Sequence, residues 1–312
     1  MSLLTTVGSF ISILYIIIDL LSASSLMKIA ETGASVSSRA FASARKDVRW
    51  TSVAIGAANF QGNIVPAMLA LALSSYLSLY PILLIVPLIL LCHDQQSAPK
   101  PKTILQITTV ALATFVSALA ALICLSYILT GGSWEFLSST YGVQLLLPDL
   151  TPNVGLWWYF FIEMFDSFRE FFLGVFWLHL AGYVGGLTFK LRNQPLFVAT
   201  CLLGIFAIFK PYPSISDTSL YLALLPLYRH VFPLMRYTFF VTSVILYATL
   251  LGPAFYYLWI YAGSGNANFF YAITLVWSLG LTLVVADSLF AVLRDEWEVE
   301  RPEMKGKEVR QI

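Results

Sequence analysis

Long apolar segments constrain this chain more than any other feature of its sequence. Ile104–Leu129 has no charged residue and Phe269–Leu293 has one acid, and each exceeds the roughly 20 residues that a helix needs to cross a bilayer. Only 11% of the 312 residues are charged, whereas 58% are hydrophobic. A soluble domain carries about 25% charged residues, so a soluble globule is excluded, and the apolar content also excludes disorder. We therefore predict a multi-span membrane protein.

The pattern within these segments predicts an all-α, polytopic transmembrane helix bundle of about nine spans. The apolar runs do not alternate with a period of two, as the strands of a transmembrane barrel would. Two of the spans are short for a bilayer crossing, and the pair within 51–91 is interrupted near Gly62-Asn63, Pro66 and Tyr80-Pro81. The predicted spans lie at 3–30, twice within 51–91, and at 104–129, 157–187, 196–209, 218–228, 237–261 and 269–293.

The distribution of basic residues gives this bundle an orientation. We expect one transmembrane domain over residues 1–293, with a polar linker at 31–50 and a loop at 130–155, followed by a charged tail at 294–312. With nine spans, most of the 18 basic residues fall on one side of the membrane, and the loops 130–155 and 253–268 contain none. The basic side is then cytosolic, together with the C-terminus, and those two loops are lumenal. A net charge of +1 argues against a nucleic-acid partner.

Three polar segments are candidate sites. The first contains Asp149 and Asn153 and precedes an aromatic run that begins at Trp157. One interpretation is an ordinary helix cap with interfacial aromatic anchors. The other is a polar pocket at the membrane surface.

The second segment is an acidic stripe made of Glu163, Asp166, Arg169 and Glu170. The three acids repeat at i, i+3 and i+7, so a continuous helix would place them on one face, with Arg169 able to pair with Asp166. The stripe is expected either to hold helices or a partner subunit together, or to line a cavity for a polar head group.

The third segment is the turn Ala262-Gly-Ser-Gly-Asn-Ala-Asn-Phe-Phe270, which contains Asn266, Asn268 and Phe269. Its glycines permit a close backbone approach, and its amides suit sugar hydroxyls and phosphoester oxygens. An ordinary lumenal turn is the alternative.

Four segments together resemble the PIG-U family, a subunit of the glycosylphosphatidylinositol (GPI) transamidase, which attaches GPI anchors to proteins in the endoplasmic reticulum. The similar segments occur in order along the chain and are Leu69-Ala-Leu-Ala-Leu-Ser-Ser-Tyr-Leu-Ser-Leu-Tyr-Pro81, Pro148-Asp-Leu-Thr-Pro-Asn-Val-Gly-Leu-Trp-Trp-Tyr-Phe-Phe-Ile-Glu-Met-Phe165, Ala207-Ile-Phe-Lys-Pro-Tyr-Pro213 and Trp259–Thr274.

The resemblance implies a subunit without catalytic residues or cofactor, because the protease chemistry belongs to another subunit. It implies an architecture similar to the polytopic (GT-C-like) mannosyltransferases of GPI synthesis. The expected partners are the other transamidase subunits, the GPI glycolipid and membrane lipids. The family's glycolipid contact would fall on Asn266 and Asn268, and we infer from position and chemistry that Phe269, Asp149 and Asn153 contribute. Family members usually carry additional N-terminal elements, so this chain is expected to be shortened there.

Two other functions stay open from the residues alone. A glycosyltransferase that uses a dolichol-linked sugar would need a catalytic carboxylate on a lumenal loop near the N-terminus, and no such loop is evident. A transporter would show an inverted repeat with matched broken helices, which we do not detect. The histidines at 93, 179 and 230 show no metal-binding spacing, so no metal site is expected.

Overall fold

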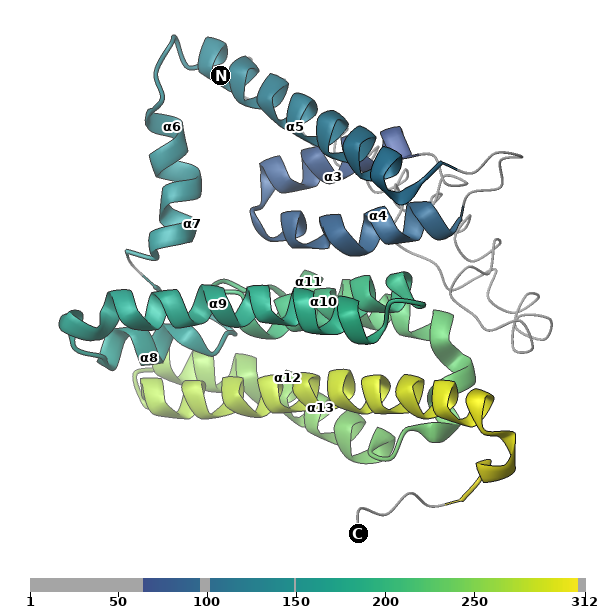
Figure 1. The fold of residues 1–312 in the computed structure, drawn as a ribbon. Helices are drawn as coiled ribbons and strands as arrows, with labels where there is room; N and C mark the ends of the chain where they lie inside the picture. Colours follow the sequence, from purple (N-terminus) through teal and green to yellow (C-terminus); the bar gives the residue numbers. More distant parts are fainter. Residues whose placement is uncertain (1–63, 96–101, 149, 308–312) are drawn as a thin grey trace, which may run out of the picture.

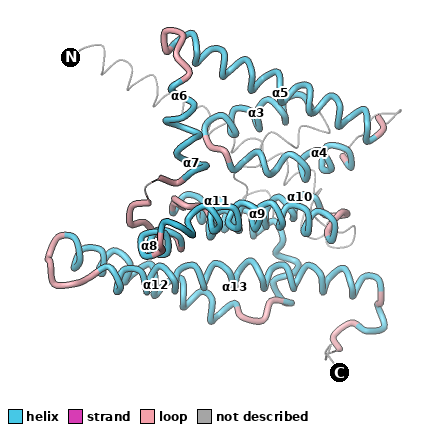
Figure 2. The backbone as a smooth tube through the Cα atoms, turned by 60° about the vertical axis from the view of Figure 1, so that its left-hand side comes forward, coloured by secondary structure: helices cyan, strands magenta, loops and turns pink. Residues whose placement is uncertain are grey.

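The computed structural model describes residues 64–95, 102–148 and 150–307, and every regular element in these ranges is a helix. This confirms the all-α prediction. Figures 1 and 2 both show three tiers: α3, α4 and α5 form one, α8 to α11 lie in the middle, and α12 and α13 form the third. The predicted first span, at 3–30, and the linker at 31–50 lie outside the described residues.

The first tier is a helical hairpin with an interrupted helix. Its Tyr80-Pro81 break was predicted, and Pro81 stands in the first turn of η2, the position in a helix that proline favours. The side chain of Thr103 and that of Gln106 form a reciprocal capping box at the start of α5. The elements are α3 (Ile64–Leu77), η2 (Tyr80–Leu84), α4 (Ile85–Asp94) and α5 (Ile104–Leu129).

A chain of short helical turns connects the first tier to the second, within the predicted loop 130–155. The Tyr141 hydroxyl donates to the carbonyl of Tyr76 at 2.6 Å, and the backbone N–H of Leu79 donates to Gln144 Oε1 at 3.3 Å. These bonds tie the connection to the first tier. The turns are α6 (Glu135–Leu137), the π-helical η3 (Ser138–Gly142) and α7 (Val143–Leu146).

The span predicted at 157–187 is not one continuous helix, and its candidate membrane helix begins only at Asp166. The segment forms two helices, α8 (Trp157–Glu163) and α9 (Asp166–Lys190), separated by extended backbone at Met164 and Phe165. Asp166 stands in the first turn of α9, where a carboxylate stabilises the helix macrodipole.

Helix α10 (Pro195–Phe209) forms the core of the molecule. All of its residues except Leu203 and Phe209 are buried, as expected for a helix that is apolar around its whole circumference. At Gly204 a Cβ atom would lie 2.7 Å from Val285 of α13 and 3.0 Å from Tyr221 of α11, so only glycine allows this approach. The chain continues through α11 (Ile215–Leu224) and η4 (Leu225–Leu234).

The third tier is the pair α12 (Thr238–Ile260) and α13 (Ala267–Glu300), which lie side by side along most of their length (Figure 1). Helix α13 extends past the predicted end of the span at 293, because its polar last turns pack through Arg294 and Glu298, whose side chains pair at 2.7 Å and are largely buried. The short η5 (Pro302–Met304) follows.

Four of these helices are long and apolar enough to cross a membrane: α5, α9, α12 and α13. Most residues of α5, α9 and α12 are not buried by the rest of the chain, so in a bilayer their apolar side chains would face lipid or other subunits. Helices α3 and α10 and the η2–α4 segment are apolar but shorter.

Candidate functional site

The aromatic segment after residue 150 packs against the beginning of α13, so two of the predicted site segments meet. The Tyr159 hydroxyl donates a 2.5 Å hydrogen bond to Asn268 Oδ1. The Tyr271 hydroxyl donates to the carbonyl of Leu156 at 3.0 Å, and the rings of Tyr159 and Tyr271 stack with centroids 4.6 Å apart. Asn268 is therefore held from α8, more than 100 residues away in sequence.

The turn between α12 and α13 depends on two glycines. Gly263 has φ +63°, in the left-handed region, and a Cβ atom at Gly265 would come within 3.1 Å of the Trp259 backbone nitrogen. Asn266 is the N-cap of α13, and its Oδ1 accepts from the backbone N–H of Phe269 at 3.1 Å.

The amide pair at this turn remains accessible. Asn266, Asn268 and Phe269 are all exposed. Among the described residues, the side-chain NH₂ groups of Asn266 and Asn268 have no hydrogen-bond partner, although both Oδ1 atoms are in use. The arrangement offers amide donors at the positive end of a long helix dipole, which suits hydroxyl and phosphate oxygens.

Asn153 has a different environment. Its Oδ1 accepts from the backbone N–H of Gly155 at 2.7 Å, and its Nδ2 donates to the carbonyls of Thr151 at 2.9 Å and Pro211 at 3.1 Å. These bonds join the loop before α8 to the loop after α10, so Asn153 organises the backbone here. Asp149, its predicted companion, lies outside the described residues.

The loop after α10 is held by a second polar contact. Lys210 and Asp217 form a largely buried ion pair at 3.0 Å, and Asp217 also completes the N-terminal capping box of α11 with Ser214. The indole nitrogen of Trp157 donates to the carbonyl of Phe209 at 3.1 Å. The three C-terminal motifs identified in the sequence thus pack on one another.

The acidic stripe does not have the predicted geometry. Glu163 ends α8 and Asp166 begins α9, so the acids do not share one continuous helical face. Glu163, Asp166 and Glu170 are exposed. The predicted pairing of Arg169 with Asp166 is wrong, because the Arg169 guanidinium donates to the carbonyl of Leu147 and lies 5.3 Å from the ring centroid of Phe161.

Arg169 instead stabilises an unusual bend. Leu147 follows α7 with φ +47°, a left-handed conformation that costs energy for a residue with a side chain, and it is buried. A basic side chain that binds a carbonyl at a helix C-terminus offsets part of this cost. Figure 1 shows α7 ending where the chain turns toward α8.

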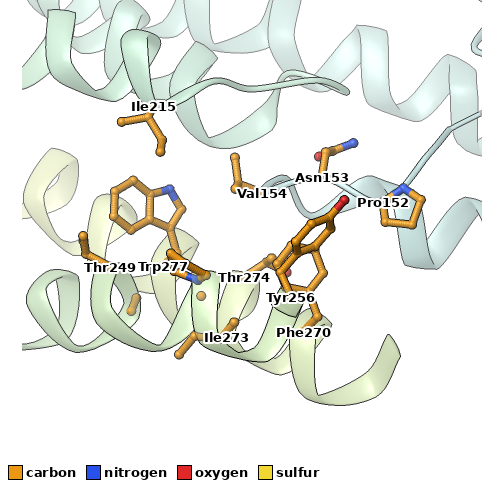
Figure 3. Close-up of a pocket in the computed structure, with 13 residues that line it drawn as sticks. Pro152, Asn153, Val154, Ile215, Thr249, Tyr256, Phe270, Ile273, Thr274 and Trp277 are labelled. Carbon is orange, nitrogen blue, oxygen red and sulfur yellow. The ribbon is translucent and has the colours of Figure 1, made fainter. Parts of the chain in front are cut away.

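A cavity of about 380 Å³ lies beside the amide turn, between the loop at 152–154, the start of α11, and helices α12 and α13 (Figure 3). The lining is mostly apolar. The polar groups that reach it come from Asn153, Tyr256 and Trp277, together with Thr249 and Thr274, whose hydroxyls are bonded to their own helices. No motif in the sequence predicted this cavity, and the nearest signal for it is Gly252-Pro253 inside an apolar span.

Comparison with known proteins identifies the family. The family model described as GPI transamidase subunit PIG-U matches residues 49–277. The GPI-anchor transamidase component PIGU of Homo sapiens is 41% identical over 240 residues, which is 76% of this chain and 55% of that protein. The chain belongs to the PIG-U family. The GPI transamidase component GAB1 of Saccharomyces cerevisiae is 36% identical over 270 residues, 84% of this chain and 66% of that protein.

The PIG-U match includes the whole site described above. The matched residues 49–277 contain the loop with Asn153, the Tyr159–Asn268 contact and every residue that lines the cavity. The chain spans about half the length of its human PIG-U relative.

Proposed function

We propose that this chain acts as a non-catalytic subunit of GPI transamidase and holds the GPI glycolipid at the turn between α12 and α13. Its family membership supports the transamidase assignment, since its relatives carry the names of GPI transamidase components. The observation that supports the lipid contact is the exposed pair Asn266 and Asn268 at the beginning of an apolar helix long enough to span a membrane. Within the described part of the chain, their NH₂ groups have no hydrogen-bond partner.

The physical basis of the contact is hydrogen bonding at an interface. Sugar hydroxyls and phosphate oxygens accept hydrogen bonds from amide NH₂ groups. The exposed Phe269 ring, stacked on Phe255 at 6.0 Å, provides an apolar surface beside them. An aromatic and amide combination of this kind suits a ligand that is polar at one end and apolar at the other.

We also propose that the chain crosses the endoplasmic-reticulum membrane about nine times, with an architecture similar to GT-C-like mannosyltransferases and with its C-terminus in the cytosol. Its partners are the other transamidase subunits, the GPI glycolipid and membrane lipids. Asp149 and Asn153 support the lumenal surface near the glycolipid. The exposed acids Glu163, Asp166 and Glu170, beside Arg169, form a surface for assembly with a partner subunit.

The decisive experiment replaces both amides. Asn266→Ala with Asn268→Ala removes two exposed amides, and we expect at least a tenfold loss of GPI attachment in cells that lack the endogenous subunit. Asn266 also caps α13, so a second variant, Asn266→Ser with Asn268→Ala, keeps a capping oxygen while it removes both amides. Loss of attachment in this variant is then due to the missing amides and not to the missing cap. Co-purification of the other subunits should be unchanged in both variants. Wild-type attachment by the double alanine variant at equal expression would refute the proposal.

A further inference from the structure

The beginning of α12 carries a group of exposed basic and aromatic side chains, which we call the Arg236 patch. It consists of Arg229 and Phe232 of η4 together with Arg236, Tyr237 and Phe239. Helix α12 has 23 residues, a length of about 34 Å at 1.5 Å per residue, whereas the hydrocarbon core of a bilayer is about 30 Å thick. When α12 crosses a bilayer, the patch therefore lies at the membrane surface opposite to the amide turn.

The position of Arg236 is fixed from two sides. Its backbone N–H donates to both carboxyl oxygens of the buried Asp287 at 3.0 Å. Its guanidinium carbon lies 3.9 Å from the ring centroid of Phe290, and both partners belong to α13. A planar guanidinium that is already oriented on a ring loses less conformational entropy when it binds an anion.

The positive charge of Arg236 has no carboxylate partner among the residues that the structure describes. Arg192 offers the contrast, because its guanidinium pairs with Asp94 at 3.2 Å. The side-chain contact of Arg236 is the Phe290 ring, while the Asp287 carboxyl group is 4% exposed and binds backbone N–H groups. The guanidinium N–H groups of Arg236 are therefore available to an anion at the membrane surface.

The aromatic side chains of the Arg236 patch suit the boundary between head groups and lipid chains. Tyr237 is 52% exposed and Phe239 is 88% exposed, although both are at the beginning of an apolar helix. Phe232 follows Arg229 by three residues and shares its exposed face of η4, while other residues of η4 are buried in the core. Rings in such a position enter the apolar layer, and the basic groups stay at the level of the phosphates.

We propose that the Arg236 patch binds an anionic phospholipid, with the phosphate of the head group on the Arg236 guanidinium. A guanidinium forms two parallel hydrogen bonds with phosphate oxygens. A free phosphate ion would accept the same bonds, but the exposed rings of the patch would contact nothing, whereas a lipid places its acyl chains against them. A zwitterionic lipid carries its own cation beside the phosphate and gains less from Arg229 and Arg236. The site is at the other end of α12 from the amide turn, and it does not depend on the function proposed above.

Native mass spectrometry of the full chain in detergent tests this proposal. The probes are dioleoyl phosphatidic acid and dioleoyl phosphatidylcholine, which share their acyl chains and differ in the charge of the head group. We expect the wild type to bind phosphatidic acid at least tenfold more tightly. Arg236→Gln should reduce this preference about fivefold, the effect expected of one basic residue beside anionic head groups. Added salt should also reduce it, because the patch is exposed.

The matched control is Arg192→Gln, because Arg192 is a partly exposed arginine that Asp94 already neutralises. It should leave the lipid preference unchanged, and both variants should keep the wild-type unfolding midpoint. If Arg236→Gln lowers that midpoint, Phe290→Leu removes the ring beneath the guanidinium and should reduce the preference at least twofold.

Four results would overturn the proposal. They are equal affinity of the wild type for the two lipids, an unchanged preference in Arg236→Gln, an equal loss of preference in Arg192→Gln, and displacement of the bound lipid by millimolar inorganic phosphate. The last result would assign the patch to a free phosphate ion in place of a lipid.

Discussion

The buried carboxyl group of Asp287 is the polar contact that we expect to contribute most to the packing of α12 on α13. The side chain is 4% exposed, and its two oxygens accept from the backbone N–H of Arg236 at 3.0 Å. One of them also accepts from the N–H of Tyr237 at 2.9 Å. Tyr237 directly precedes α12, so no earlier turn of this helix supplies a carbonyl to the backbone N–H groups of Arg236 and Tyr237. Asp287→Ala leaves these two N–H groups without an acceptor.

The magnitude follows from the number of stranded donors. A fully buried N–H group without a partner costs about 1–3 kcal/mol. Arg236 and Tyr237 are exposed residues whose N–H groups regain water in part, so Asp287→Ala should lower the free energy of unfolding by about 1–3 kcal/mol for the two donors together. Asp287→Asn keeps one acceptor oxygen, and its expected cost is about half of that, roughly 0.5–1.5 kcal/mol. Unfolding would be measured on the purified chain by titrating sodium dodecyl sulfate into mixed micelles, with tryptophan fluorescence as the signal.

The control for this prediction is Asp166→Ala. Asp166 is an exposed acid in the first turn of α9 without a described hydrogen bond or ion pair, so its loss should cost less than about 1 kcal/mol through the helix dipole. Equal decreases in the free energy of unfolding for the two alanine variants would refute the argument, because they would show that the Asp287 carboxyl group stabilises the fold no more than an exposed carboxyl group does.

Two further variants test the core and the bend before α8. Gly204→Leu places side-chain atoms where a Cβ alone would lie 2.7 Å from Val285, and this overpacking should lower the free energy of unfolding by about 1–3 kcal/mol in the same titration. The control is Gly182→Leu in α9, where an added Cβ would meet nothing within 4 Å, and it should not show this loss. Arg169→Leu removes the donor that binds the Leu147 carbonyl, and limited proteolysis should cleave between 143 and 156 several times faster than in the wild type; an unchanged rate would exclude a stabilising role for this contact.

Hydropathy alone predicts the helices whose surroundings are uniformly apolar. Helix α5 occupies the predicted span 104–129, and α10 and α12 begin and end within one residue of their predicted limits. This agreement has a physical cause, because a long uncharged run satisfies its backbone only as a helix when water is absent. The number of spans stays a prediction, since four helices of the described residues meet the length and composition of a membrane crossing.

Hydropathy fails where a polar residue changes its role with context. The i, i+3, i+7 spacing of the acids assumes a continuous helix through Met164 and Phe165, where the backbone is in fact extended. The sequence did contain a signal for this break, since an acid such as Asp166 is favoured in the first turn of a helix. The partner of Arg169 had no local signal: the Leu147 carbonyl is available only because that residue adopts a left-handed conformation at the end of α7.

The candidate site combines both kinds of determinant. The sequence identified the amides Asn266 and Asn268 because uncharged amides between two apolar helices are conspicuous. It did not reveal the Tyr159 contact or the cavity, because both arise from packing between segments that are distant along the chain. Asn268 lies in the first turn of α13, and Phe270, two residues further along the same turn, lines the cavity. A single helix therefore carries both the amide that Tyr159 holds and part of the cavity wall, and neither could be placed without knowing which distant segments pack against that helix.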